Sequence, residues 1–165
     1  ANITLTSTPS LITRQRMNLG RTVSRGLEAD VDFHPAPRWS LSSGYLFTDA
    51  TVREFPGNEA LVGLRLPQTP EHQWTGGIQY AGASNRVALA LRYSASQFDD
   101  DENQLPLDSF FVVDLFDSHR LSDSFDVFAA AENLFDRRYQ VGRTPLLTVG
   151  PPRLIRVGIR WRLRG

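Results

Sequence analysis

The chain has 165 residues, and its 18 basic and 18 acidic side chains balance to a net charge of zero at neutral pH. That balance excludes the strong positive field with which nucleic-acid-binding proteins attract phosphates. All of the basic residues are arginine, and there is no cysteine. Lysine Schiff-base chemistry, thiol catalysis, disulfides and thiolate metal sites are therefore excluded as well.

The first residues, "ANITLTS", are already strand-like and contain neither a starting methionine nor a signal peptide. We therefore expect residues 1–165 to be one piece of a longer protein, whose N-terminal part and any export signal precede it. No apolar run approaches the ~18 residues of a membrane-spanning helix, so no transmembrane helix is expected.

Residues 27–34 are the first clear segment in which every second residue is apolar. Such alternation is typical of a β-strand, because its successive side chains point to opposite faces. The face opposite the apolar residues is acidic in this segment: Glu28, Asp30 and Asp32. The pattern recurs in 39–49, 74–80 and 86–93. Residues 108–119 are ambiguous because they contain four consecutive apolar residues.

The last predicted strand, 155–163, alternates most regularly. Its odd residues are apolar, and its even residues include Arg156, Arg160 and Arg162. An arginine-rich face suits a wide, wet interior in which the acids of 27–34 could pair with it. A solvated sheet face, which needs no such pairing, is the alternative.

Short and long connections alternate between the predicted strands. Short polar turns are expected at 34–38, 81–85 and 121–124, and longer loops near 6–14, 54–71, 99–107 and 140–152. One end of the sheet would then have tight turns and the other long loops. The prediction is an all-β, antiparallel up-and-down meander of about eight strands.

Aromatic side chains gather near the predicted strand ends. Near the short turns these are Phe33, Trp39, Tyr80, Phe125 and Trp161, and toward the long loops they include Phe135 and Tyr139. If no bulge intervenes, Phe125 and Phe135 share a face. Ten residues at a tilt of ~40° climb roughly 26 Å, which matches an apolar band of ~25 Å. With the turn asymmetry, this favours a transmembrane β-barrel segment over a soluble sheet.

Four motifs in order resemble the C-terminal barrel of TonB-dependent outer-membrane receptors. "SRGLEADVDFHP" is similar to that family's Gly-aliphatic-Glu strand, and "LVGLRLPQTPEHQW" to its Leu-Pro-x-x-Pro-x-His loop exit. "SQFDDDENQLPLDSFFVVDL" resembles the Asp-rich loop and Val-Asp strand that follow. "AENLFDRRY", with the later "GPPRLIRVGIRWRL", resembles the penultimate strand end and the Pro-Arg entry to the last strand. The family usually ends on an aromatic residue, whereas Arg162-Leu163-Arg164-Gly165 follow Trp161 here.

The resemblance implies a bacterial outer-membrane barrel of about 22 strands with a plug domain inside. Such a receptor takes up a metal chelate such as a siderophore, or a cobalamin-like ligand, driven by the TonB complex of the inner membrane. Residues 1–165 would supply about eight strands of this larger barrel, with its extracellular loops and the closing strand. The plug and the TonB-contacting segment would lie upstream. No enzymatic role, no cofactor and no nucleic-acid partner is expected.

In such a receptor, ligand contacts come from the long loops. The candidates are Phe55, Asn58, Arg65, Gln68, Gln140, Arg143 and Thr144, set against ordinary polar loop residues as the alternative. An arginine among them could hold an anionic chelate by charge-assisted hydrogen bonds. Glu28, Asp30, Asp32, Arg156, Arg160 and Arg162 would face the lumen. The aromatic residues named above would anchor the barrel at the two membrane interfaces.

A resident metal site is not expected. The run Asp99-Asp100-Asp101-Glu102 offers carboxylates to a cation such as Ca²⁺, but it lacks the EF-hand spacing and is interpreted as a solvated acidic loop. The three histidines, His34, His72 and His119, share no ligand spacing.

Two other architectures fit the alternation. One is a complete small outer-membrane barrel of eight strands with a structural or adhesive role, in which residues 2–6 would contact residues 153–163. The other is a soluble all-β ligand-binding protein with its apolar face turned inward.

Overall fold

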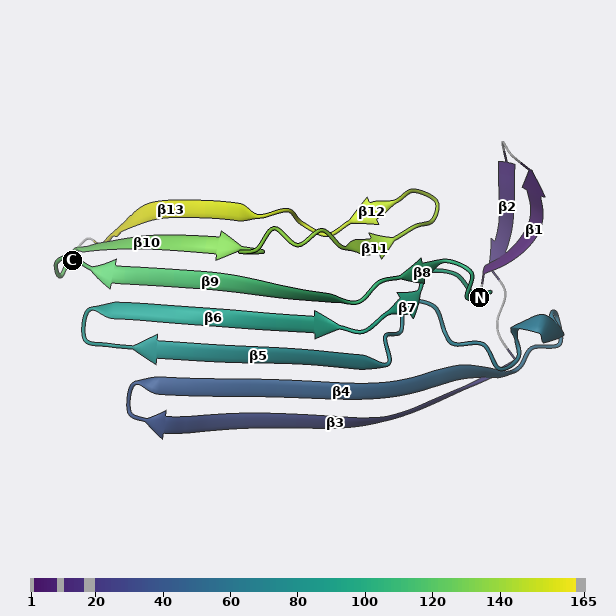
Figure 1. Cartoon of the computed structure of the whole chain (residues 1–165), viewed down its shortest axis with the longest axis horizontal. Helices are drawn as coiled ribbons and strands as arrows, with labels where there is room; N and C mark the ends of the chain where they lie inside the picture. Colours follow the sequence, from purple (N-terminus) through teal and green to yellow (C-terminus); the bar gives the residue numbers. More distant parts are fainter. Residues whose placement is uncertain (1, 9–10, 17–19, 163–165) are drawn as a thin grey trace.

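The computed structural model describes residues 2–8, 11–16 and 20–162. Residues 163–165, where the sequence departs from the family's aromatic terminus, lie outside the described residues. The main element of the structure is an antiparallel sheet of seven strands in the order β13-β10-β9-β6-β5-β4-β3 (Figure 1). The strands are β3 (Arg21–Ala36), β4 (Trp39–Glu54), β5 (His72–Ala81), β6 (Asn85–Ser94), β9 (Phe110–Arg120), β10 (Phe125–Glu132) and β13 (Leu154–Trp161). The predicted all-β antiparallel meander is confirmed.

Three small hairpins accompany this sheet. They are β1 (Asn2–Thr8) with β2 (Leu11–Arg16), β7 (Gln97–Phe98) with β8 (Pro106–Leu107), and β11 (Gln140–Gly142) with β12 (Thr148–Val149). The expected loop at 6–14 is wrong, because most of it belongs to the first hairpin. This pairing also leaves seven strands in the main sheet where about eight were expected. The short 3-10 helix η1 (Glu59–Leu61) was not anticipated.

Strand register sorts the side chains into two faces. Leu27 pairs with Phe47 and Trp39 with Tyr80, which places apolar positions beside one another across the sheet. We call this the apolar face; it comprises the odd-numbered residues of β3, β4, β6, β9, β10 and β13 and the even-numbered residues of β5. The opposite, polar face includes Glu28, Asp30, Asp32, Arg156 and Arg160.

The sheet forms a single layer, so its large apolar side chains remain uncovered. Val157 is 77% and Ile159 70% exposed on the last strand. Among the described residues, the one apolar cluster of buried side chains is Val52, Phe55 and Leu61, under the first long loop. An exposed apolar face of this extent is what a strand needs when lipid is its solvent.

All of the short turns lie at one end of the sheet and all of the long loops at the other (Figure 1). The short turns follow β3, β5 and β9, and the long loops follow β4, β6 and β10. The predicted asymmetry is therefore confirmed. It is the asymmetry of outer-membrane barrels, in which short turns face the periplasm and long loops the exterior.

The sheet is open, with β3 and β13 as its edges. A closed eight-stranded barrel would pair residues 2–6 with residues 153–163. In the described part of the chain, β1 pairs with β2 and β13 with β10. The pairing that the small closed barrel requires is not formed.

Across the described residues, no helix has the length and hydropathy needed to cross a bilayer.

Candidate functional site

The carboxylate of Asp99 joins three long loops at the outer end of the sheet. Gln68 Nε2 donates to its Oδ1 at 2.9 Å from the loop after β4. Its Oδ2 accepts from the backbone N–H groups of Arg143 and Thr144, each at 2.8 Å, and from Thr144 Oγ1 at 2.7 Å. Asp99 is only 8% exposed. The expectation of a solvated acidic loop is therefore wrong for this residue.

The surroundings of Asp99 act on its pKa in two directions. Burial raises the pKa of the carboxyl, because it disfavours the charged form. The hydrogen bonds from Gln68, Thr144 and Arg143 stabilise that form and together outweigh burial, so the pKa lies below the ordinary 3.8. The carboxylate of Asp99 is therefore ionised at neutral pH. We call its hydrogen bonds with Gln68, Arg143 and Thr144 the Asp99 latch.

Asn103, in the loop after β6, links this loop to the loop after β4 through hydrogen bonds with the backbone of Arg65. Its Oδ1 accepts the Arg65 N–H at 2.9 Å, and its Nδ2 donates to the Arg65 carbonyl oxygen at 3.0 Å. Asn103 and Gln68 both have positive φ, 56° and 52°, and Asn tolerates this conformation best among residues other than Gly. Asp100 accepts the N–H groups of Gln104 and Leu105, so carboxylates of the acidic run stabilise its own turn.

The structure gives several ligand-contact candidates a packing or bridging role. Phe55 is 3% exposed and packs with Val52 and Leu61, which leaves it almost no surface for a ligand. Asn58 caps η1 through the Ala60 N–H. Arg65 lies 3.5 Å from Glu71. The remaining four are Gln68, Gln140, Arg143 and Thr144; Gln68 and Arg143 are exposed, and the other two are half-buried.

Asn133, within "AENLFDRRY", ends β10 and ties it to the entry of β13. Its φ of 48° interrupts the alternation of side chains that continues along β10. Its Oδ1 accepts the Arg137 N–H at 2.8 Å, and its Nδ2 donates to the carbonyl oxygens of Arg137 and Pro151, both at 2.9 Å. The Asp136 carboxylate accepts the Arg153 N–H at 3.0 Å. The motif therefore forms a closed turn.

This turn separates the two aromatic residues that follow Asn133. Phe135 is 74% exposed, whereas Tyr139 is 9% exposed and stacks on Phe110 with ring centroids 4.2 Å apart. Tyr139 was expected at the outer interface and instead packs inside the loop assembly. The climb estimated between Phe125 and Phe135 assumed a continuous strand. Because β10 ends at Glu132, before the turn, that estimate does not hold.

The other interface aromatic residues lie at the short-turn end of the apolar face. Trp39 and Tyr80 contact each other with centroids 5.0 Å apart, and Phe125 stacks on Trp161 at 5.9 Å. Phe33, near the end of β3, is 56% exposed. At the other end, Tyr45, Trp74, Tyr93 and Phe111 form one continuous row across four strands. Two aromatic levels therefore bound the apolar face.

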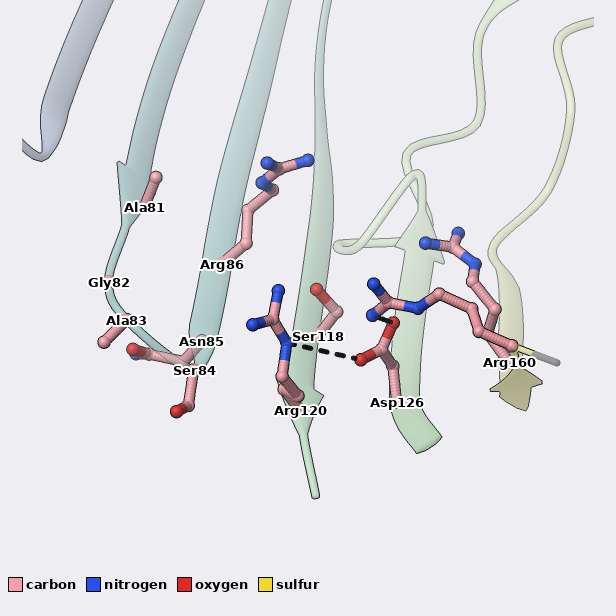
Figure 2. Close-up of a pocket in the computed structure, with 11 residues that line it drawn as sticks. Ala81, Gly82, Ala83, Ser84, Asn85, Arg86, Ser118, Arg120, Asp126 and Arg160 are labelled. Carbon is pink, nitrogen blue, oxygen red and sulfur yellow. Dashed lines mark hydrogen bonds and ion pairs between the residues drawn. The ribbon is translucent and has the colours of Figure 1, made fainter. Parts of the chain in front are cut away.

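The short-turn end of the polar face contains an open cavity of about 270 Å³ lined by arginine side chains (Figure 2). Those side chains are Arg86, Arg120, Arg160 and Arg162. Asp126, which is 9% exposed, lies among them, 3.9 Å from Arg120 and in an ion pair with Arg162. One carboxylate among four guanidinium groups leaves this part of the wall strongly positive.

The acids predicted for the polar face, Glu28, Asp30 and Asp32, lie on β3 and are exposed. They do not meet the arginines of β13, which is the opposite edge of the open sheet. Arg156 pairs instead with Glu132 on the adjacent β10. Among the described residues, no three His, Asp or Glu side chains are arranged to hold a metal ion.

Sequence reasoning missed the roles of Asp99, Asn103 and Asn133. Asn and Asp are common turn formers, which predicts their place in loops. Their partners are up to 45 residues away, and no local pattern reveals such pairings.

Comparison with known proteins identifies this architecture. The family model "TonB dependent receptor-like, beta-barrel" matches residues 2–134. The catecholate siderophore receptor Fiu of Escherichia coli (strain K12) is 26% identical over 125 residues, which cover 73% of this chain and 16% of Fiu. The vitamin B12 transporter BtuB of Photobacterium profundum is 21% identical over 128 residues, covering 78% of this chain and 20% of BtuB. The chain therefore spans about a fifth or less of these relatives.

Solved structures share the fold. The siderophore receptor PiuA from Acinetobacter baumannii superposes with a TM-score of 0.77 at 18% identity, over 85% of this chain and 22% of PiuA. The ferric yersiniabactin uptake receptor FyuA from Yersinia pestis gives 0.75 at 19% identity, over 92% of this chain and 24% of FyuA. The chain belongs to the TonB-dependent receptor β-barrel family, and it is a segment of a bacterial outer-membrane barrel.

Proposed function

We propose that the protein containing this chain is an outer-membrane receptor that actively imports a metal chelate, with a ferric siderophore as its first candidate ligand. The observation that carries the proposal is the family match over residues 2–134. The name of the relative Fiu, a catecholate siderophore receptor, supports the siderophore class. The name of BtuB, a vitamin B12 transporter, makes a cobalamin-like ligand the second candidate.

The chain's share of this function is structural and selective. Residues 1–165 supply the C-terminal barrel wall and three outer loops, while the plug and the TonB-contacting segment belong to the rest of the protein. The importer draws its energy from the TonB complex and catalyses no covalent reaction. Residues of the polar face, including Arg156, Arg160 and Arg162, line the lumen.

In this proposal, exposed loop side chains next to the Asp99 latch bind the ligand. Gln68 and Arg143 are exposed, and both are anchored to the latch, Arg143 through its backbone N–H. Gln140 and Thr144 flank Arg143 on the same loop. An anchored arginine can present its guanidinium group to an anionic chelate without first being ordered, which favours binding.

The test is uptake by cells in which the full-length gene is deleted and then restored. Restored cells are expected to accumulate radioactive iron supplied as a catecholate chelate, and to lose this ability when TonB is removed. Arg143→Gln in the full-length protein is expected to weaken uptake, whereas Arg138→Gln, the same charge change at another exposed arginine of this loop, should not. Uptake of labelled cobalamin instead of iron would change the ligand class. Uptake of neither by a correctly inserted receptor would overturn the proposal.

A further inference from the structure

A charged residue, Asp117, lies on the apolar face of the sheet. Strand register places it beside Val87 on β6 and Ala129 on β10. Its side chain is exposed, and within the described ranges its carboxylate has no hydrogen bond or ion pair. A charge on the lipid-contacting surface of a barrel raises the free energy of the folded state, so an ionisable residue in this setting points to a binding partner.

His119 lies two positions further along the same face of β9, close to the strand end at Arg120. It is exposed and pairs in register with Asn85 and Val127. A carboxylate and an imidazole therefore follow each other on one face, near the short turns. By the asymmetry of the loops, this is the periplasmic end of the barrel.

An apolar cavity of about 280 Å³ adjoins Asp117 on this face. It is lined by Trp39, Ile78, Tyr80, Val87 and Leu89. Register makes Trp39, Tyr80, Val87 and Asp117 one continuous row across β4, β5, β6 and β9. The cavity and the carboxylate are thus neighbours, separated by no intervening strand.

The two features fit the two parts of one molecule. An apolar cavity that opens toward lipid accommodates an alkyl chain, and an exposed carboxylate beside it attracts a cation with N–H donors. A hard metal cation fits less well, because it needs several oxygen ligands and Asp117 supplies the only carboxylate in this row.

We propose that this surface binds a phospholipid with a primary ammonium headgroup from the periplasmic leaflet. One acyl chain occupies the cavity, the ammonium group donates to Asp117, and His119 lies within reach of the headgroup phosphate. The inference goes beyond import and does not depend on which ligand is taken up.

Native mass spectrometry of the full-length receptor in detergent tests this site. Phosphatidylethanolamine and phosphatidylglycerol with the same acyl chains are added in turn, since only the first has an ammonium group. The native receptor is expected to prefer phosphatidylethanolamine by about fivefold, the effect of one exposed charge pair. Asp117→Asn should remove that preference, and the matched control Asp32→Asn, on the polar face, should retain it.

A second variant tests the cavity. Leu89→Trp fills it and should lower the occupancy of both lipids without changing their ratio, provided that the receptor keeps its heat-dependent electrophoretic shift as a sign of folding. Equal binding of the two lipids by the native receptor would overturn the proposal. So would a preference that survives Asp117→Asn, or a photo-crosslink from position 117 that captures a protein and no lipid.

Discussion

Thr144 donates its hydroxyl to Asp99 at 2.7 Å across 45 residues of sequence. This contact, with the two backbone N–H groups beside it, makes the loop after β10 dependent on a carboxylate in the loop after β6. The mouth of the barrel therefore behaves as one connected unit in this segment, and ligand contacts placed on either loop share a common support.

Asp99→Asn is expected to loosen the outer loops while leaving the sheet intact. The amide retains one acceptor oxygen but loses the charge, and hydrogen bonds to charged groups contribute about 1.5–3 kcal/mol each. Hydrogen exchange at the amides of Arg143 and Thr144 should show that the free energy of local opening falls by roughly 2–3 kcal/mol. Asp108→Asn, an exposed carboxylate in the neighbouring segment, is the control. Unchanged protection in Asp99→Asn would contradict the latch.

The same latch predicts an acid transition of the loops. The pKa of Asp99 lies below 3.8 in the folded protein, so ionisation stabilises the folded loops at any pH above that value. The stabilisation is lost as the pH falls through the lowered pKa, and no change from this group is expected near neutrality. Protection factors of the two amides should fall below about pH 4 in the native protein. In Asp99→Asn this step should be missing.

Asn133→Ala is expected to destabilise the junction between β10 and β13. It removes three side-chain hydrogen bonds of a residue that is 3% exposed and has a positive φ. The free energy of unfolding, measured with urea on the full-length protein in detergent, should fall by about 3 kcal/mol or more. Asn133→Gly keeps the positive φ accessible, so its free energy of unfolding should fall by less. An equal decrease in both variants would mean that the lost side-chain hydrogen bonds alone account for the destabilisation.

Gly150→Ala should disturb the stack of Tyr139 on Phe110. A Cβ atom at Gly150 would lie 2.0 Å from Cζ of Tyr139, so the ring has to move. Overpacking of this kind costs about 1–3 kcal/mol, measurable as a lower midpoint of thermal unfolding. Gly142→Ala on the same loop meets its nearest atom at 3.7 Å and should be nearly neutral. A neutral Gly150→Ala would mean that Tyr139 can leave Phe110 freely.

The strands could be predicted from sequence because their determinants are local. Alternation in 155–163 and in 27–34 is a property of neighbouring residues, and the turns after β3 and β5 are marked by Pro, Gly and Asn. The pairing of β1 with β2 was missed because residues 6–10, Thr-Ser-Thr-Pro-Ser, are rich in turn formers and were interpreted as part of a long loop. Tyr139 was misplaced because two residues before it, Asn133 and Asp136, have positive φ and turn the chain out of the strand.

The contacts of the outer loops could not be predicted in the same way. Asp99 is one of four consecutive acids, and nothing in their order distinguishes the one that becomes buried. Its role depends on three loops meeting in space, which follows from the register of the whole sheet. Alternation assigned the arginines of 155–163 to one face, but their partners on β10 follow from strand neighbours that the sequence does not mark.

The length of β3 and β4 has a consequence for the height of the barrel wall on that side. Each of these strands has 16 residues, which at a tilt of ~40° climb roughly 42 Å, against an apolar band of ~25 Å. The excess lies at the long-loop end of the sheet, because β3 ends and β4 begins beside a short turn. This side of the barrel wall therefore rises further from the bilayer than the side formed by β10 and β13, each of which has eight residues.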